Sequence, residues 1–442
     1  MNAAHLPTPI VAVTSALGTE LSQWAGSHPD APLADLETAA LTAVRAALPA
    51  LLRGMVQATQ QALTATAVRC PCCAHAALVR DWRTRQVLTS CGVLRWERRW
   101  AYCPTCGASF GAGDAALGLR AYQQQSAGLQ AMLVSVGGAC AFGEATRLLR
   151  QLTGLAVSPE TVRRVTEAAG TSIADAQDAA TAVYAAGAEP PVTDPAPGVL
   201  VAETAGVMVR YLDGWHEAKV GVVGGWVTGD DGGGRLQQQS YVAAREESSA
   251  FAWRWGAAAA QRGALTVVGW QGAHHGVAAL RHVVVLGDGA HWIWDAAATQ
   301  FGERTEIVDY YHACEHLTAV AEALYGAQTP AAQAWAERQR GVLLAEGVDA
   351  VLPHVRSPGG LSTAATETLR RERGFFTANQ ARMHYPSFRA QGLPIGSGAI
   401  ESSAKHVVQQ RLKRPGARWS EPGGRALLAL RAHQASAYCI AA

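Results

Sequence analysis

The stretch His-Val-Val-Val-Leu-Gly-Asp-Gly, residues 282–289, decides our interpretation of the fold. An unbroken apolar run that ends in a glycine turn is typical of a short, fully buried strand. A helical pattern follows at 291–301 and a second strand pattern at 305–310, which together predict an α/β arrangement. Asp288 therefore stands directly after a buried strand, although an Asp-Gly pair in this position is also a common turn.

Three β-rich runs precede this strand, at 199–209, 216–228 and 236–245, and a helical pattern occupies 247–262. Residues 313–385 are helical throughout, and a glycine-rich turn at 396–398 opens a last amphipathic helix. This order of elements is typical of an RNase H-like core, in which acids come from the first strand, the fourth strand and the final helix. The stretch 313–385 is then an insertion.

The chain is expected to be a multidomain α+β protein. Its predicted parts are N-terminal helices (1–65), a zinc ribbon (66–118), a helix-turn-helix-like helical domain (119–187), a proline-rich linker (188–198), and an RNase H-like α/β catalytic core (199–312 and 386–442) with an all-helical insertion (313–385). Of these, the N-terminal helices have no chemical signature and favour packing or dimerisation.

Composition excludes some classes of protein. Of the 442 residues, 49% are hydrophobic and 16% charged, which excludes global disorder. The net charge is only +2, so nucleic-acid binding has to rest on local basic patches. No run of 18 apolar residues and no secretion signal is visible, and the cysteines cluster, so we expect a reducing, cytoplasmic location and no membrane span.

Two Cys-x-x-Cys pairs predict a structural zinc site. Tetrahedral zinc takes two thiolates from each such turn, and Cys70, Cys73, Cys103 and Cys106 have this spacing. Cys72 could replace Cys73 as a zinc ligand, but its spacing is poorer. We expect Cys91 to be a buried thiol and His75 to lie on the surface. The alternative is two unrelated reduced pairs.

Basic residues cluster in three places, each of which predicts DNA contact or, alternatively, a solvated face. Arginines surround the ribbon among tryptophans, and two lie on the second helix of the helix-turn-helix candidate. A run without acids follows Glu401 along the last helix and its exit, where Trp419 could stack on an unpaired base. The candidate DNA-binding residues are Arg95, Arg98, Arg99, Arg163, Arg164, Lys405, Arg411, Lys413, Arg414, Arg418 and Trp419.

Carboxylates at strand and helix ends predict a second kind of metal site. Asp288 follows one strand, Asp309 ends another with His312 three residues on, and Glu401 begins the last helix. Hard oxygen ligands of this kind suit Mg²⁺ or Mn²⁺, and two such ions can clamp the attacking and leaving oxygens of a phosphodiester. Each signal is weak alone: a Glu near a helix start is also a favourable charge against the dipole.

Several long motifs resemble those of ISKra-type bacterial insertion-sequence transposases, which are related to Mutator-like DDE transposases. The resemblance covers roughly residues 66–435 and includes the Cys-Pro pairs. The other motifs that carry it are 206–209 with 213–222, Leu286–Trp294, Asp309–Leu317, 381–385, Gly392–Glu401 and Arg411–Ser420. The resemblance implies that Asp288 and Glu401 are the second and third catalytic acids. It also implies that His312 lies near the active site, where it orients the scissile phosphate or the leaving group; a structural histidine is the alternative.

The first acid is missing. By the resemblance it should stand just before Gly206-Val-Met-Val, where this chain has Ala205. A deliberate Asp-to-Ala change and a natural inactive relative both explain this. Glu203 lies on the same strand face, about 6.6 Å away, and is an awkward substitute, as is Asp213 in the following turn.

The resemblance implies a DNA transposase that binds element ends and performs Mg-dependent phosphodiester hydrolysis and strand transfer, impaired in this chain by Ala205. Expected partners are double-stranded DNA with terminal inverted repeats, target DNA, and further copies of the chain in a homodimer or higher oligomer. The expected location is the bacterial cytoplasm, in association with the nucleoid. The main rival is a non-enzymatic DNA-binding protein derived from a transposase, and a weaker one is a zinc-stabilised structural or RNA-binding protein.

Overall fold

A computed structural model describes residues 8–64, 67–188, 192, 196–229, 234–264 and 282–440. The protein is a mixed α+β chain that divides into two compact units, Met1–Thr166 and Glu167–Ala442. The division falls inside a helix, at residue 166, and not in the proline-rich segment 188–198, most of which lies outside the described residues.

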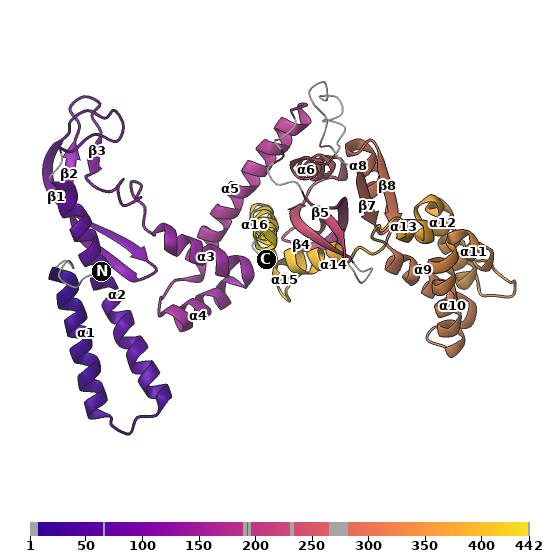
Figure 1. Cartoon of the computed structure of the whole chain (residues 1–442), viewed down its shortest axis with the longest axis horizontal. Helices are drawn as coiled ribbons and strands as arrows, with labels where there is room; N and C mark the ends of the chain where they lie inside the picture. The colour runs from indigo at the N-terminus through magenta and orange to yellow at the C-terminus, as the bar shows by residue number, and fades with distance from the viewer. Residues whose placement is uncertain are drawn as a thin grey trace. The chain divides into compact units, whose positions relative to one another are not determined.

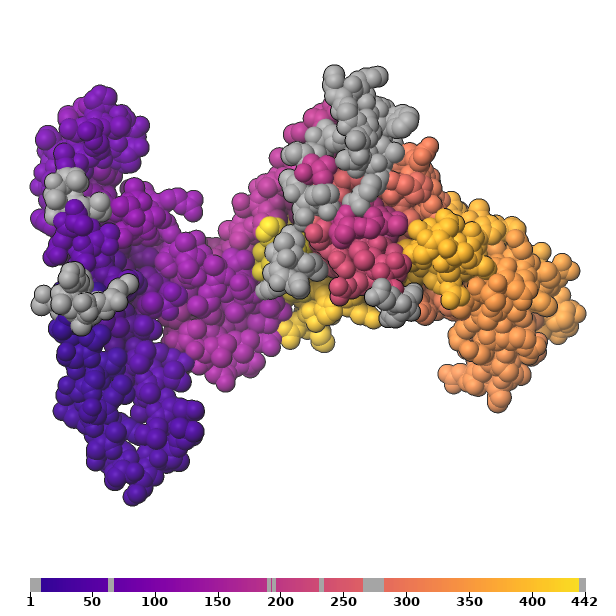
Figure 2. All heavy atoms as spheres, in the orientation of Figure 1, coloured from indigo at the N-terminus to yellow at the C-terminus, as the bar shows by residue number. Residues whose placement is uncertain are grey.

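The first unit begins with a pair of helices, α1 (Thr8–Ser27) and α2 (Leu33–Thr64), joined by a short turn (Figure 1). Many of their apolar side chains face solvent, among them Leu33, Leu41 and Met55. The two helices form the indigo part of the surface in Figure 2. Residues 33–62 are long and apolar enough to cross a membrane by length and composition alone, with only 17% of the apolar window buried. This is weak evidence, since a single such helix near the N-terminus also occurs in proteins without membrane spans.

A three-stranded antiparallel sheet follows, with β1 (Leu78–Thr89), β2 (Gly92–Tyr102) and β3 (Ser109–Gly111) in sequence order. Its inner residues Val87, Leu94 and Trp96 pack with Val56 of α2 in one small core. Alternation of buried and exposed side chains along β2 explains this, because successive strand residues point to opposite faces.

Helices α3 (Ala127–Ala139) and α4 (Phe142–Thr153) pack with the start of α5 (Pro159–Ala185) around Leu129, Leu133 and Leu149. Gly154, in the left-handed conformation, ends α4, and the Ser158 hydroxyl accepts a hydrogen bond from the N–H of Thr161 as the N-cap of α5. This helix, turn and helix lie within the segment 119–187 that was predicted to be helix-turn-helix-like. Helix α5 continues to Ala185, and six of its residues 171–185 are alanine, the best helix former.

The second unit is built on a five-stranded sheet with the order β6-β5-β4-β7-β8. Strand β5 is antiparallel to both of its neighbours, whereas β7 and β8 run parallel to β4. The strands are β4 (Val199–Tyr211), β5 (Gly214–Thr228), β6 (Gly234–Ala244), β7 (Val283–Gly287) and β8 (Arg304–Val308).

Helices cover both faces of this sheet (Figure 1). On one face α6 (Ser248–Gln261) packs closely: a Cβ atom at Gly221 of β5 would lie 2.9 Å from the ring of Trp255. The neighbouring helix α8 (His291–Gln300) extends this layer. The other face meets α14 (Gly398–Ser403), the π-helix η4 (Ala404–Gln409), α15 (Gln410–Leu412) and α16 (Glu421–Ile440).

Between β8 and α14 the chain is helical in every described element, as predicted for 313–385. Leu317, Trp335, Leu343 and Phe376 from this segment belong to the same core as the strands β4 and β7. The elements are α9 (Tyr310–Tyr325), α10 (Pro330–Glu346), α11 (Val348–Val351), η2 (Leu352–His354), α12 (Thr363–Ala378), η3 (Gln380–Arg382) and α13 (Tyr385–Ala390).

Candidate functional sites

The four predicted cysteines meet at one point. The Sγ atoms of Cys70, Cys73, Cys103 and Cys106 all lie within 4.8 Å of one another, with 3.5 Å between Cys70 and Cys106 and between Cys73 and Cys103. Such a cluster can hold a metal ion such as zinc. In the part of the chain that the structure describes, no other group of three or more His, Cys, Asp or Glu side chains is close enough to do so.

Two turns of matching geometry present these thiols. The N–H of Cys70 donates to the carbonyl of His75 at 2.8 Å, and the N–H of Cys103 donates to the carbonyl of Ala108 at 2.8 Å. The fifth residue of each turn has a positive φ, 60° at Ala74 and 75° at Gly107. Each Cys-x-x-Cys segment therefore folds back on itself and points both of its sulfur atoms to the same side.

The electrostatics of the cluster favour a cation. Burial opposes ionisation of Cys70, but the backbone N–H groups of Cys73 and Cys72 outweigh it and lower its pKa to about 6. The N–H of Ala108 favours ionisation of Cys106, yet the neighbouring sulfurs of Cys70 and Cys73 raise its pKa to about 12. Without a cation the thiolates oppose one another; a bound metal removes this penalty. Cys72 is exposed and lies outside the cluster.

The ribbon arginines differ in exposure. Arg95 is exposed and donates to Gln86 Oε1 at 2.6 Å. Arg98 is only 7% exposed and forms an ion pair with Asp114, so it is not part of an outer basic face as expected. Arg99 is half-buried. Burial of Arg98 follows from its position on the inner face of β2, in line with Leu94 and Trp96.

The carboxylates of the second unit lie on elements that meet at one edge of the sheet. Residues of β4 pair with residues of β7 at a constant offset of 83, from Leu200 with Val283 to Glu203 with Leu286. If this offset continued for two residues beyond the last pair, Ala205 would lie level with Asp288, which directly follows the end of β7. Asp288 itself is half-buried, and its Oδ1 accepts a hydrogen bond from the N–H of Ala290 at 2.9 Å.

Glu203 joins β4 to the helix that carries Glu401. Its side chain is 3% exposed, and its Oε2 accepts a hydrogen bond from the N–H of Ile400 at 2.8 Å. Burial raises the pKa of Glu203 to about 8, an effect that the charge of Asp309 reinforces and the N–H of Ile400 opposes. Because side chains alternate along a strand, position 205 points to the same face as Glu203, toward α14. Glu203 is therefore engaged in holding α14.

Asp309 has a positioning role that the sequence did not disclose. Its Oδ1 accepts from the N–H of His312 at 2.8 Å as the N-cap of α9. Its Oδ2 accepts from both the N–H and the hydroxyl of Ser397, in the turn that opens α14. One buried carboxylate thus fixes the start of the helical segment and the turn before Glu401.

Glu401 lies in the first turn of α14 and is exposed. The amphipathic helix predicted over 400–412 is interrupted three residues later, at Ala404, by η4, whose i to i+5 hydrogen bonds shift the residues that follow around the axis. Such π-helical turns occur frequently at functional sites.

His312 is part of an aromatic and histidine cluster beside Asp288. Its ring lies 5.0 Å from that of His316, which stacks on Phe375 at 3.6 Å and pairs with the buried Glu372. Phe375 in turn covers the turn after β7, since a Cβ atom at Gly289 would lie 2.6 Å from its Cε2. The histidines are therefore connected to the Asp288 turn through one phenylalanine ring.

The basic run after Glu401 is only partly on the surface. Lys405, Lys413 and Arg418 are exposed, and Arg414 is half-buried. Arg411 is 3% exposed and lies over the ring of Trp419 at 4.9 Å.

Trp419, expected to stack on an unpaired base, is instead a buried residue. It is 7% exposed, and its Nε1–H donates to the carbonyl of Leu412 at 3.0 Å. Its own N–H donates to the carbonyl of Arg210, and its carbonyl accepts from Leu212, so the segment is tied to the end of β4. The indole therefore packs the exit of the last helix against the sheet and is not available to a base.

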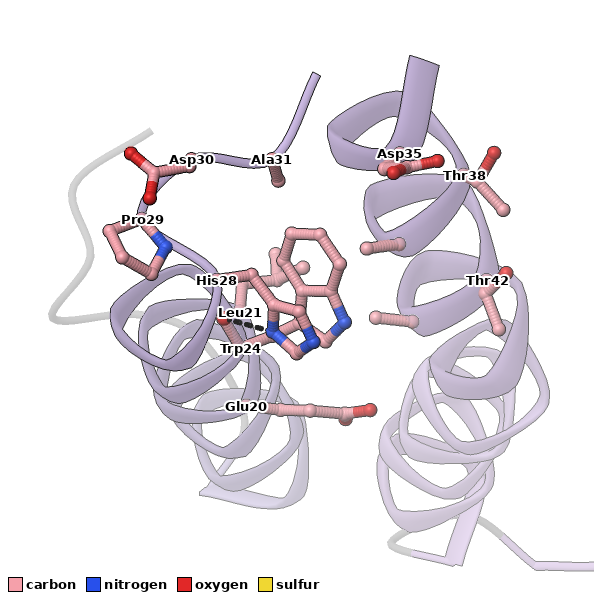
Figure 3. Close-up of a pocket in the computed structure, with 12 residues that line it drawn as sticks. Glu20, Leu21, Trp24, His28, Pro29, Asp30, Ala31, Asp35, Thr38 and Thr42 are labelled. Carbon is pink, nitrogen blue, oxygen red and sulfur yellow. Dashed lines mark hydrogen bonds between the residues drawn. The ribbon is translucent and has the colours of Figure 1, made fainter. Parts of the chain in front are cut away.

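On the helix-turn-helix candidate, Arg163 forms an ion pair with Glu160 at 2.6 Å, while Arg164 is exposed. The helix pair α1 and α2 encloses a cavity of about 760 Å³. Trp24 of α1 and His28, which directly follows that helix, line it with their rings stacked at 4.4 Å (Figure 3).

A scan of the sequence against models of protein families finds no match, and a search of the curated proteins finds none either.

Proposed function

We propose that this chain binds DNA and has the architecture of a DDE transposase whose first carboxylate is replaced by Ala205. The observation that carries the proposal is the register of β4 against β7. Continued by two residues beyond its last pair, this register would bring position 205 level with Asp288, and Glu203, on the same face of β4 as position 205, bonds α14. A carboxylate at position 205 would complete a set of three acids from the first strand, the fourth strand and the late helix.

The sheet order supports this proposal. An antiparallel meander, β4 to β6, is extended from its first strand by the parallel strands β7 and β8. That order, with helices on both faces and a helical insertion before α14, is in line with an RNase H-like core. A counterpart with aspartate at position 205 would hydrolyse the phosphodiester at an element end and join the freed 3′-OH to target DNA.

The residues present do not fit a two-metal magnesium site. Mg²⁺ needs converging oxygen ligands. Here one of the three positions is alanine, Asp288 and Glu401 belong to no close group of three ligands among the described residues, and Glu203 is engaged by Ile400. The proposal for this chain is therefore DNA binding with strongly impaired cleavage.

Three surfaces carry the proposed binding. The residues that we propose to contact phosphates are all exposed: Arg95 on the ribbon, Arg164 on α5, and Lys405, Lys413 and Arg418 after Glu401. Because two DNA ends have to be brought together, we propose a dimer or larger oligomer. The exposed apolar side chains of α1 and α2 support self-association there.

The test compares this chain with Ala205→Asp and Ala205→Asn in Mg²⁺ or Mn²⁺, on DNA that carries the sequences flanking its coding region. We expect all three to bind, and only the aspartate variant to cleave. The double variant Ala205→Asp with Glu401→Gln should lose that cleavage. Cleavage by the asparagine variant would contradict the assignment of position 205.

The alternative is a non-enzymatic DNA-binding protein that is derived from a transposase. Binding by all variants with cleavage by none would favour it. A competition experiment between flanking-repeat DNA and RNA of the same sequence addresses the RNA-binding alternative, because the proposal requires the DNA to win.

A further inference from the structure

The ribbon contains a cavity that the proposed chemistry does not use. It has a volume of about 590 Å³ and lies between the first cysteine turn, the ends of β2 and β3, and the loop 112–122. Volumes of this size are ordinary for small-molecule sites. All of its walls belong to the first compact unit.

The charges around this cavity are strongly one-sided. One acid, Asp114, faces five arginines, which leaves an excess of four positive charges. The arginines are Arg69, Arg85, Arg98, Arg99 and Arg120.

Two of these arginines are buried and incompletely satisfied. Arg85 is 9% exposed and Arg98 is 7% exposed, and the Nε atom of each is without a hydrogen-bond partner. Arg85 donates its Nη2 to the carbonyls of Arg120 and Gln123, and Arg98 pairs with Asp114. Burial lowers the pKa of Arg98, and the charges of Arg85 and Arg83 lower it further. Buried guanidinium groups that retain an N–H donor without an acceptor are stabilised by a bound anion.

Aromatic rings form the other part of the lining. Trp100 and Phe110 are half-buried, and Tyr122 at the rim is 91% exposed. Tyr122 also has a φ of 58°, which is uncommon for a residue other than glycine. Arginines beside exposed aromatic rings match phosphate beside a base.

We propose that this cavity binds a nucleoside monophosphate unit, with the phosphate on the arginines and the base against the aromatic rings. The unit has two possible sources, a free nucleotide and an unpaired nucleotide at a DNA end. Only the second source rests on the proposed function, and the cavity argument stands without it.

The first arm of the experiment uses the full-length, zinc-loaded chain and isothermal titration with dAMP, inorganic phosphate and deoxyadenosine. We expect dAMP to bind at least about tenfold more tightly than either fragment, because only dAMP engages both parts of the lining. Equal affinity for dAMP and phosphate, or no binding of dAMP, would overturn the proposal.

Variants at the rim test the location without removing a buried group. Arg120→Gln and Tyr122→Ala should each weaken dAMP binding about tenfold. The matched control is Arg53→Gln, an exposed arginine of α2 that lies outside the cavity, which should leave dAMP binding unchanged. An equal loss in the control would show that dAMP binding depends on the overall positive charge of the protein and not on this cavity, and it would refute the site. Zinc content and circular dichroism establish that each variant is folded.

The second arm separates the two sources. A duplex with one unpaired terminal nucleotide is compared with a blunt duplex, with and without dAMP as competitor. Preference for the unpaired end, abolished by dAMP and by Arg120→Gln, assigns the site to DNA ends. Binding of dAMP without such a preference assigns it to free nucleotide, even if the chain binds no DNA and the proposed function fails.

Discussion

Replacing Glu203 by glutamine should change how the stability of the second unit depends on pH. Glutamine keeps an oxygen that can accept from the N–H of Ile400, but it has no proton to lose. In the parent the folded-state pKa of Glu203 is raised from its ordinary value of 4.5 to about 8. Below pH 4.5 the carboxyl is protonated in both the folded and the unfolded state, so the two proteins have the same pH dependence.

Between these two values only the folded parent retains the proton, so its free energy of unfolding falls as pH rises. The fall ends when the pH passes the folded-state pKa. A raised pKa of this size corresponds to about 5 kcal/mol, at about 1.4 kcal/mol for each pH unit. Relative to that of the parent, the free energy of unfolding of Glu203→Gln should therefore rise by up to about 5 kcal/mol between about pH 5 and about pH 9.

The assay is urea unfolding of the full chain, followed by circular dichroism at closely spaced pH values. Exposed Glu337→Gln serves as the matched control, and its stability should follow that of the parent at every pH. Only the difference between variant and parent matters, since other titrating groups are shared. If that difference does not change with pH, the buried and protonated state of Glu203 is wrong.

Two further predictions concern the ribbon and the helix α5. The purified chain should carry about one zinc ion, which Cys103→Ser loses and Cys91→Ser retains, as measured by elemental analysis; zinc retained by Cys103→Ser would refute the four-thiolate site. Gly170→Ala should destabilise the protein by about 1–3 kcal/mol in thermal unfolding, because its Cβ would lie 2.2 Å from the carbonyl oxygen of Ala426. The control Gly341→Ala has open space around its Cβ and should not destabilise the protein, so equal effects of the two changes would contradict this packing.

Patterns that repeat locally were predictable from the sequence. The run Val283–Gly287 and the alternating segments before it became strands because each pattern matches the period of its own element. The cysteine cluster was predictable for a similar reason, since each Cys-x-x-Cys turn supplies its own geometry.

Contacts between distant residues were not predictable. Glu203 bonds a backbone group 197 residues away, and Asp309 bonds one 88 residues away. Nothing in the local sequence distinguishes these acids from solvated ones. Trp419 illustrates the opposite error: among basic residues it was expected at the surface, but the end of β4 passes beside it and buries it.

The two bonds of Asp309 also have a mechanical consequence. The helical segment that follows β8 and the turn that precedes Glu401 share this one carboxylate as their anchor. A force that lifts α9 from the sheet would therefore also pull on the turn at Ser397, all the more because the N–H of Tyr310 donates to the carbonyl of Ile395 at 2.8 Å. A partner that displaces the helical segment would therefore also displace the turn at Ser397, four residues before Glu401.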